Sequence, residues 1–460
     1  MKCSRSIEAG PLMGSVGLRS ADPLAGSALF LHRTWLAAAA VALVLSPAVA
    51  SARTAPSYRA AQADVAAWQA NGRRLLWVQD GQLRPEAERV IDLAHGARLD
   101  GLDPDSYRLR NLEGAVRAAF GGNPRDLAKA DLLLSQTLVA LARDMRRSRS
   151  TEMKFADAAA VPPVPSAGLL LNSAANAPSL SAWLEAMPWM HPAYATLRNA
   201  LTSAPDGRQA QILRINLERA RILPAAIQPG RYVLVDAAAA RLYMIENGVV
   251  KDSMRVVVGR ADNPTPMLAG MLRFAILNPY WNAPPDLAAT RLAPHVVSEG
   301  IGYLAKARYE VLSDWGDHAK RVDPRTIDWQ AVVDGKMPDI RMRQLPGPDN
   351  SMGRMKFMFP NDMGIYLHDT DDKSLFAAPA RQKSGGCIRL QSAARLGKWL
   401  YGKPLTTTSK VPEQKVALPN PVPVYVTYLT AAPENGQIAF RDDFYNRDGL
   451  GQRPSETAAR

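Results

Sequence analysis

The chain contains the stretch Gly-Ile-Tyr-Leu-His-Asp-Thr at residues 364–370 and, after a polar interval, Ser-Gly-Gly-Cys-Ile-Arg-Leu at residues 384–390. Apolar residues alternate in both stretches, which is typical of β-strands. If the two strands are neighbours, His368 and Cys387 meet although they are far apart in the sequence. We therefore expect these strands to place the two side chains in one site.

A cysteine, a histidine and two glycines together are the parts of a thiol acyltransferase. The thiolate is the attacking form, so Cys387 needs a base to take its proton, and His368 is the candidate. Gly385 and Gly386 leave the backbone bare, so the main-chain N–H groups of Gly386 and Cys387 are candidate oxyanion donors. A lone Cys or a lone His is usually structural. The combination indicates catalysis, and Ser392 is expected to cap a helix that anchors the cysteine strand.

The N-terminus has the pattern of an export signal. Residues 35–50 form an apolar run behind Arg33, and the run ends in small-x-small triplets of the kind that a signal peptidase accepts. We assign residues 1–52 to a signal peptide or signal anchor. The run is short for a membrane span, which favours cleavage over a retained membrane anchor.

Export changes the meaning of the cysteines. Cys3 lies in the leader, so the mature chain has one thiol, Cys387, which cannot form an intramolecular disulfide. A solitary thiol in an oxidising compartment is a nucleophile or a buried bystander, and the surrounding motif favours the first. The six histidines are scattered, and neither Cys-x-x-Cys nor His-Glu-x-x-His occurs. We therefore expect no metal and no cofactor.

The composition is that of a soluble globular protein, with 47% apolar and 22% charged residues over 460 positions, which is room for roughly three domains. The formal net charge of +13 suits a polyanionic cell envelope, although basic residues can equally be solvated surface. The paired arginines are too short a signal for nucleic acid, and export makes that partner unsuitable.

Residues 53–225 are predicted to form an α-helical domain. Pro85 opens one helical run over residues 86–99, and a second stripe follows over residues 132–143. Neither stripe carries chemistry. The interval 158–178 is rich in Pro, Ala and Ser and is interpreted as a loop or linker.

Strand character begins at Arg231, where two strands flank the turn Asn247-Gly248, a strong hairpin signal. Residues 421–429 are predicted to form the final strand of this pattern, so we place a β-rich domain at residues 230–430. Residues 286–345 interrupt it with a polar segment that has helical pieces at 287–293 and 328–333. An insertion of this length is usually functional or disordered. Residues 431–460 are interpreted as a C-terminal tail with a frayed end from Asn446 onward.

The two stretches at 364–390 resemble the signature of the L,D-transpeptidases with a YkuD-type catalytic domain, which is a His, about fifteen residues, then Ser-x-Gly-Cys-Ile/Val-Arg. The residue before the second glycine is often His in this family and is Gly385 here, as in the large periplasmic members, so no role for a second histidine follows. Segments at 76–77, 101–107 and 191–194 resemble the helical scaffold domain of those members. The matching signature residues are His368, Ser384, Gly386, Cys387, Ile388 and Arg389.

The resemblance implies an α+β multidomain chain, with the α-helical scaffold domain followed by a mainly-β sandwich catalytic domain that carries residues 286–345 as a capping insertion. It implies a peptidoglycan L,D-transpeptidase in the periplasm of a Gram-negative bacterium. Cys387 would attack a tetrapeptide stem, release D-Ala and form a thioester, and a diaminopimelate amine would resolve it into a 3→3 cross-link. Carbapenem-type β-lactams would be inhibitors.

The resemblance also suggests roles for neighbouring residues. The main-chain carbonyl of Asp369 would orient His368, so its carboxylate need not take part. Arg389 and Tyr366 would bind substrate or support the site, or would be buried hydrogen-bonding groups. The aromatic pair at 280–281 either walls the cleft through Trp281 or belongs to a core. Ser384 and Gly385 complete the supporting set.

Other activities fit the same residues. Water in place of the amine would give an L,D-carboxypeptidase or an amidase. A papain-like peptidase places its cysteine before its histidine, which is the opposite order, and a non-catalytic wall-binding protein would not need Cys387. Large relatives commonly carry a peptidoglycan-binding module after the segment resembling 191–194, but only residues 202–213 separate it here from the next helix. No such module fits there.

Overall fold

The computed structural model describes residues 57–72, 75–147, 149, 152–204 and 206–450. The leader predicted at residues 1–52 and the last ten residues lie outside this part of the chain. Among the residues that are described, no helix is both long and apolar enough to cross a bilayer.

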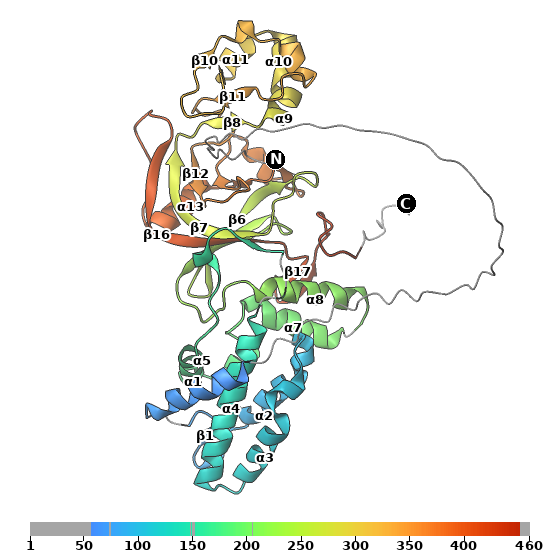
Figure 1. The fold of residues 1–460 in the computed structure, drawn as a ribbon, viewed down its shortest axis with the longest axis vertical. Helices are drawn as coiled ribbons and strands as arrows, with labels where there is room; N and C mark the ends of the chain where they lie inside the picture. The colour runs from blue at the N-terminus through green and yellow to red at the C-terminus, as the bar shows by residue number, and fades with distance from the viewer. Residues whose placement is uncertain (1–56, 73–74, 148, 150–151, 205, 451–460) are drawn as a thin grey trace, which may run out of the picture. The chain divides into compact units, whose positions relative to one another are not determined.

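The N-terminal part is a bundle of helices (Figure 1). Pro85 and Asn123 stand directly before α2 and α4, and the Asn123 side chain accepts a hydrogen bond from the Arg125 N–H, which satisfies a free donor at the start of α4. The elements are α1 (Tyr58–Ala70), β1 (Val78–Gln79), β2 (Gln82–Leu83), α2 (Glu86–His95), η1 (Gly96–Asp100), η2 (Pro104–Tyr107), α3 (Leu109–Ala119), α4 (Pro124–Met145), α5 (Ala167–Ala175), α6 (Leu180–Ala186), α7 (Pro192–Ser203) and α8 (Gly207–Arg221).

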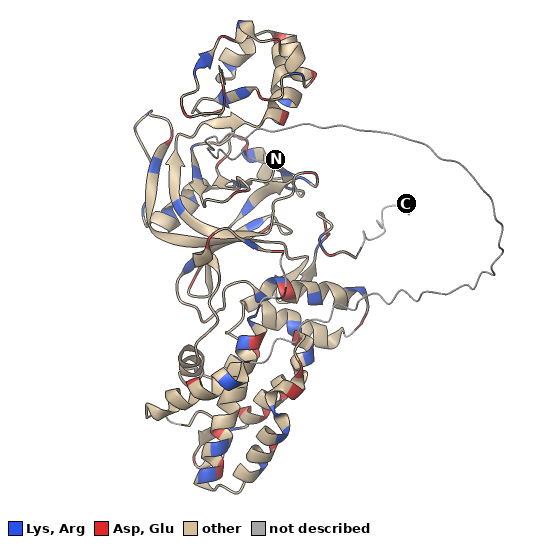
Figure 2. Ribbon diagram, viewed as in Figure 1, with Lys and Arg blue, Asp and Glu red and all other residues tan. Residues whose placement is uncertain are grey.

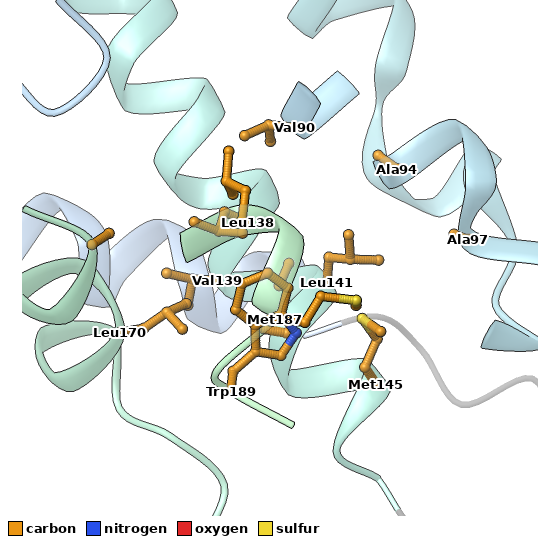
Figure 3. Close-up of a cluster of buried hydrophobic side chains, with 14 of the residues drawn as sticks. Val90, Ala94, Ala97, Leu138, Val139, Leu141, Met145, Leu170, Met187 and Trp189 are labelled. Carbon is orange, nitrogen blue, oxygen red and sulfur yellow. The ribbon is translucent and has the colours of Figure 1, made fainter. Parts of the chain in front are cut away.

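The core of this bundle forms around α4, whose long buried face meets α1, α2 and α3. Figure 3 shows Trp189 and Met187 lying among side chains of α4 and α5, including Leu138 and Leu170. Trp189 is fully buried, so its indole contributes a large apolar area to the core. The two helical stripes predicted from the sequence are confirmed as α2 with η1, and as α4.

The prediction of a loop or linker at 158–178 is wrong, because this interval contains η3 (Ala158–Ala160) and α5. The Ser166 hydroxyl accepts a hydrogen bond from the Leu169 N–H and so begins α5. Leu170 and Leu171 then bury their side chains in the helical core. Tertiary burial here outweighs a composition that is typical of loops.

The C-terminal part is β-rich, with strands in the order β12-β13-β15-β6-β5-β4-β16-β7-β3 and β14 paired to β6. An additional β12–β7 pairing joins the strand order back on itself, so the sheet surrounds one hydrophobic core. An α-helical domain followed by a mainly-β domain is thus confirmed. The strands are β3 (Lys154–Phe155), β4 (Arg231–Asp236), β5 (Arg241–Glu246), β6 (Val249–Gly259), β7 (Leu268–Leu277), β12 (Met355–Met358), β13 (Leu367–His368), β14 (Gln382–Ser384), β15 (Ile388–Leu390) and β16 (Gln414–Thr427), with η6 (Lys373–Phe376) and α13 (Ala393–Tyr401) between them.

The helical and β parts share elements. β3 precedes α5 in the chain, yet it pairs in parallel with β7 of the β domain. The Tyr425 hydroxyl on β16 donates to the Ala160 carbonyl at 2.7 Å, and Asn216 of α8 donates to Thr430 Oγ1 at 2.8 Å. The sequence pattern indicated none of these contacts.

The insertion at 286–345 is a folded subdomain (Figure 1) rather than a loose polar loop. Its helical pieces were predicted, but its sheet was not, and that sheet recruits β8 from outside the predicted limits. The insertion also has a hydrophobic core of its own, centred on Trp329, Val332 and Met342. The elements are β8 (Trp281–Ala283), α9 (Pro285–Leu287), η4 (Ala288–Leu292), α10 (Ala293–Glu299), α11 (Gly302–Lys306), β9 (Tyr309–Leu312), β10 (Arg321–Val322), η5 (Pro324–Thr326), α12 (Trp329–Val333) and β11 (Arg341–Gln344).

The prediction of a C-terminal tail at 431–460 is wrong for residues 431–450, which pack against the rest of the protein. β17 (Ala431–Glu434) and β18 (Gln437–Phe440) form a hairpin that contacts α7 and α8. Residues 443–448 then hydrogen-bond to both parts of the protein.

Lys and Arg are spread over the helical and β parts alike, with Asp and Glu interspersed among the helices (Figure 2).

Candidate active site

The turn at 384–387 is built by Ser384, which is buried at the end of β14. Its hydroxyl donates to the Cys387 carbonyl at 2.6 Å and accepts from the Gly386 N–H at 3.2 Å. Gly386 has φ +111°, a conformation that side-chain-bearing residues rarely adopt. We call residues 384–387 the cysteine turn. Ser384 and Gly386 together fix the backbone on either side of Cys387.

The cysteine and histidine strands are adjacent, as predicted. β13 and β15 pair in parallel, with Leu367 opposite Ile388 and His368 opposite Arg389. The Ile388 N–H donates to the Tyr366 carbonyl at 3.1 Å, which continues this contact toward Cys387. Neighbouring strands therefore bring His368 and the cysteine turn together across a gap in the sequence.

His368 is 2% exposed, and its Nδ1 finds no hydrogen-bond partner among the described residues. Burial, and secondarily the positive charge of Arg389, lowers the pKa of His368 to about 3, while the main chain of Asp369 opposes this shift. The imidazole is therefore neutral at pH 7 and available as a base.

Cys387 is half-buried, and its Sγ lies 3.5 Å from the Gly364 carbonyl oxygen. Burial raises the pKa of the Cys387 thiol, whereas Tyr366, Arg389 and Lys356 lower it by favouring the thiolate. Since the thiol pKa is raised and that of His368 is lowered, a thiolate–imidazolium pair is not preformed. The arrangement suits a thiol that loses its proton as it attacks.

Tyr366 lies between the two candidate catalytic residues and the insertion. Its ring centroid is 5.6 Å from that of His368, at an interplanar angle of 62°. Its hydroxyl faces the Cys387 thiol, and burial together with that contact raises the pKa of Tyr366 well above its usual range. The same side chain packs against the core of the insertion. A supporting role for Tyr366 stays a prediction with this geometry behind it.

The other predicted site residues have separate surroundings. The Asp369 carboxylate accepts from the Arg354 N–H at 3.1 Å and pairs with Lys373. These partners occupy it, as expected for a carboxylate that takes no part in the chemistry. Arg389 has a buried Nε without a partner among the described residues, while Asp371 and Asp372 oppose the lowering of its pKa by burial. Gly385 is exposed beside the cysteine.

Trp281 belongs to the insertion core, not to an open cleft wall. It is 9% exposed, and its ring meets Tyr309 edge-on at 6.1 Å. Tyr280, by contrast, stacks under Arg343 at 4.2 Å. Of the two interpretations given to this aromatic pair, the structure favours core packing for Trp281.

The predicted oxyanion donors are in different states. The Gly386 N–H already donates to Ser384, whereas the Cys387 N–H makes no hydrogen bond to another described residue. The Gly386 carbonyl is held by the Thr265 hydroxyl at 2.7 Å. Thr265 was missed by sequence reasoning, because nothing near residue 265 marks a contact with a turn more than a hundred positions later.

A half-buried cysteine in a glycine turn, directly before a strand that pairs with the strand of a buried histidine, is an arrangement suited to thiol acyl transfer. Comparison with known proteins agrees. Residues 230–424 match the L,D-transpeptidase catalytic domain (YkuD), and residues 65–201 match the Scaffold domain. The chain thus carries an L,D-transpeptidase catalytic domain with a Scaffold domain before it.

A curated Haemophilus influenzae protein, named as a candidate L,D-transpeptidase, is 31% identical over 255 residues. That alignment covers 54% of this chain and 50% of the relative, so the chain matches about half the length of the curated relative. Among solved structures, the Ldtfm–avibactam carbamoyl enzyme is 13% identical, with 44% of this chain and 49% of that chain covered and a TM-score of 0.21. The Mycobacterium smegmatis L,D-transpeptidase is also 13% identical, with 43% of this chain and 58% of that chain covered and a TM-score of 0.21.

Proposed function

We propose that the protein is a peptidoglycan L,D-transpeptidase that forms 3→3 cross-links. The observation that carries the proposal is the parallel pairing of β13 with β15, which sets a neutral buried imidazole beside the turn that holds Cys387. The match to the L,D-transpeptidase catalytic domain supports the class of reaction, and the geometry supports the assignment of roles.

The reaction consists of two acyl transfers. Cys387 Sγ attacks the carbonyl at the L-centre of the diaminopimelate in a tetrapeptide stem, and His368 takes the thiol proton. The C–N bond to terminal D-Ala breaks, and the proton passes to the leaving amine. The amine of a second diaminopimelate then attacks the thioester, forms the new amide and returns the proton to sulfur. Neither step requires a metal or an oxidant.

Substrate binding is proposed for the cationic groups at the site. Stem peptides carry carboxylates, and the buried Nε of Arg389 is a donor that the described residues leave unpaired. Lys356 lies opposite His368 on β12 and pairs with Glu413 at 3.2 Å. The same site would react with carbapenem-type β-lactams at Cys387. We place the reaction in the periplasm, on the strength of the predicted leader.

The test is incubation of purified mature protein with disaccharide-tetrapeptide, followed by separation of products by mass. A cross-linked dimer supports the proposal. Trimmed tripeptide alone would indicate an L,D-carboxypeptidase, and no change would indicate a non-catalytic wall-binding protein.

Cys387→Ala should abolish both D-Ala release and carbapenem adduct formation with the fold intact, because losing the sulfur costs little packing but removes the nucleophile. Release of D-Ala by this variant would refute the role of Cys387.

The insertion is proposed to cap the site and to favour the amine over water as acceptor. Tyr366 links it to the cysteine turn through its packing on the insertion core. Because that core is separate from the core of the β domain, the insertion should unfold alone.

Two adjacent valines on α12 test this cap. Val332→Asp puts a carboxylate at a fully buried position and should disorder the insertion, whereas Val333 is 36% exposed and Val333→Asp should be tolerated. We expect acylation by a small carbapenem to survive in Val332→Asp while cross-linking falls and tripeptide accumulates. Equal loss of acylation and cross-linking would show that the insertion supports the site only structurally.

A further inference from the structure

A short segment near the C-terminus is linked to the cysteine turn through an intervening loop. We call residues 443–448 the C-terminal clasp. The Asp443 carboxylate closes it by accepting from the N–H groups of Arg447 at 2.8 Å and Asp448 at 2.7 Å. The Tyr445 ring stacks on Tyr428 with centroids 5.0 Å apart, and the Tyr445 N–H donates to the Tyr428 hydroxyl at 2.9 Å. The clasp is therefore an ordered element fixed to the end of the β domain.

Two side chains of the clasp hold the loop formed by residues 259–265, which we call the bracing loop. The Tyr445 hydroxyl donates to the Gly259 carbonyl at 2.6 Å, and Arg447 donates to the Thr265 carbonyl at 3.0 Å. The loop is tight, because a Cβ on Gly259 would come within 2.1 Å of the Asn263 carbonyl oxygen. Both ends of the bracing loop are thus tied to the clasp.

The bracing loop in turn holds the cysteine turn. The buried Thr265 hydroxyl accepts from the Gly259 N–H at 2.8 Å and donates to the Gly386 carbonyl at 2.7 Å. A second bond joins the bracing loop to the cysteine turn, because the main-chain N–H of Arg260 donates to the Ser384 carbonyl at 2.9 Å. The link from Tyr445 to the cysteine turn is therefore continuous and lies wholly within the described residues.

The bond at the Gly386 carbonyl matters because of peptide geometry. The Gly386 C=O and the Cys387 N–H belong to one planar trans peptide unit, so fixing the carbonyl fixes the direction in which the N–H points. That N–H makes no hydrogen bond to another described residue, and an oxyanion donor is effective only if it is already aimed where the negative charge develops.

We propose that Tyr445 and Arg447 are positioning residues for acyl transfer, acting through Thr265 to aim the Cys387 N–H at the oxyanion. The proposal rests on the proposed function. The catalytic-domain match ends at residue 424, so the clasp lies outside the matched domain. Arg219 of α8, which is 1% exposed, anchors the clasp by donating to Asp448 at 2.6 Å and to the Arg447 carbonyl at 2.9 Å. Helix α8, which follows the matched Scaffold domain, is therefore connected to the site through this segment.

The test compares two reactions of the same thiol in Tyr445→Phe, which removes the hydroxyl but keeps the stacked ring. Acylation by a carbapenem builds an oxyanion, whereas alkylation by iodoacetamide builds none. We expect the maximal first-order acylation rate to fall about tenfold, since small misplacement of a catalytic group has effects of this order. The half-saturating carbapenem concentration, the alkylation rate and the thermal midpoint should stay near those of the wild type.

The matched control is Phe444→Leu, because Phe444 is the exposed neighbour of Tyr445 and makes no bond to the bracing loop in the described structure. It should acylate as the wild type does. Variants of Arg447 test the bond from this side chain to the Thr265 carbonyl. Arg447→Ala should reduce the maximal acylation rate, and Arg447→Lys should restore part of it. These variants keep the proposal testable if one substitution prevents folding.

The outcomes separate the two proposals. If the wild type forms no carbapenem adduct at Cys387, the proposed function fails. If the wild type reacts and Tyr445→Phe reacts equally fast, the positioning proposal fails alone. Equal losses of acylation and alkylation in Tyr445→Phe would also overturn it, because they would show a damaged thiol environment rather than a misaimed oxyanion donor.

Discussion

The surroundings of His191 in the scaffold domain and of His368 in the catalytic domain are alike in one respect and opposite in another. Both imidazoles are deeply buried, and in both burial, followed by a nearby arginine charge, lowers the pKa to about 3. His191 Nδ1 accepts from the Ala193 N–H at 3.2 Å and caps α7. His368 Nδ1 has no partner among the described residues. A shifted pKa thus marks both, and only the unpaired nitrogen and the neighbouring thiol distinguish the candidate base.

The largest expected difference between the two histidines is in acylation. His368→Ala should slow carbapenem acylation by roughly two to four orders of magnitude, the usual range for loss of a general base. A residual reaction should remain and should rise with pH, because the thiolate fraction rises. His191→Asn, which keeps an acceptor at the helix N-cap, should acylate at nearly the wild-type rate. Stopped-flow or mass-resolved adduct formation measures both.

Similar acylation rates in His368→Ala and His191→Asn would show that the two histidines do not differ in function as proposed. An unchanged rate in His368→Ala at neutral pH would remove it as the base. A comparable loss in His191→Asn would mean that the scaffold histidine supports the site, contrary to its position as a helix cap.

The next effect is on stability. A histidine whose folded pKa is about 3 and whose unfolded pKa is near 6.5 favours the folded state fully above pH 6.5 and loses that contribution as the pH falls toward 3. Asn does not titrate. Between pH 7.5 and pH 5, the free energy of unfolding of the wild type should therefore fall relative to that of His191→Asn by on the order of 2 kcal/mol. Urea unfolding followed by tryptophan fluorescence at both pH values measures this difference, and a constant difference would show that His191 is not buried as a neutral group.

The sequence allowed the pairing of the histidine and cysteine strands to be predicted, because alternation and glycine placement are local signals. It did not reveal α5, since the loop-like composition of 158–178 hides four apolar positions that meet only in the folded bundle. The core of the insertion was missed for a similar reason, because Trp281 and Met352 join it from outside the interrupted segment. The clasp was predicted to lie in the C-terminal tail, with a frayed end from Asn446 onward, because its bonds go to Gly259, Thr265 and Arg219, far away in the chain.

The smallest expected effect concerns the thiol that distinguishes His368 from His191, and it acts through Tyr366, whose ring lies beside His368. The Tyr366 hydroxyl and main chain oppose the rise that burial imposes on the pKa of the Cys387 thiol. Tyr366→Phe should raise the thiol pKa further, because the hydroxyl no longer favours the thiolate, so that iodoacetamide alkylation at neutral pH slows severalfold. Tyr309→Phe in the insertion core is the control and should leave the pH profile of alkylation in place. If the profile of Tyr366→Phe coincides with that of the wild type, the hydroxyl does not act on the thiol, and Tyr366 serves only to pack the insertion against the site.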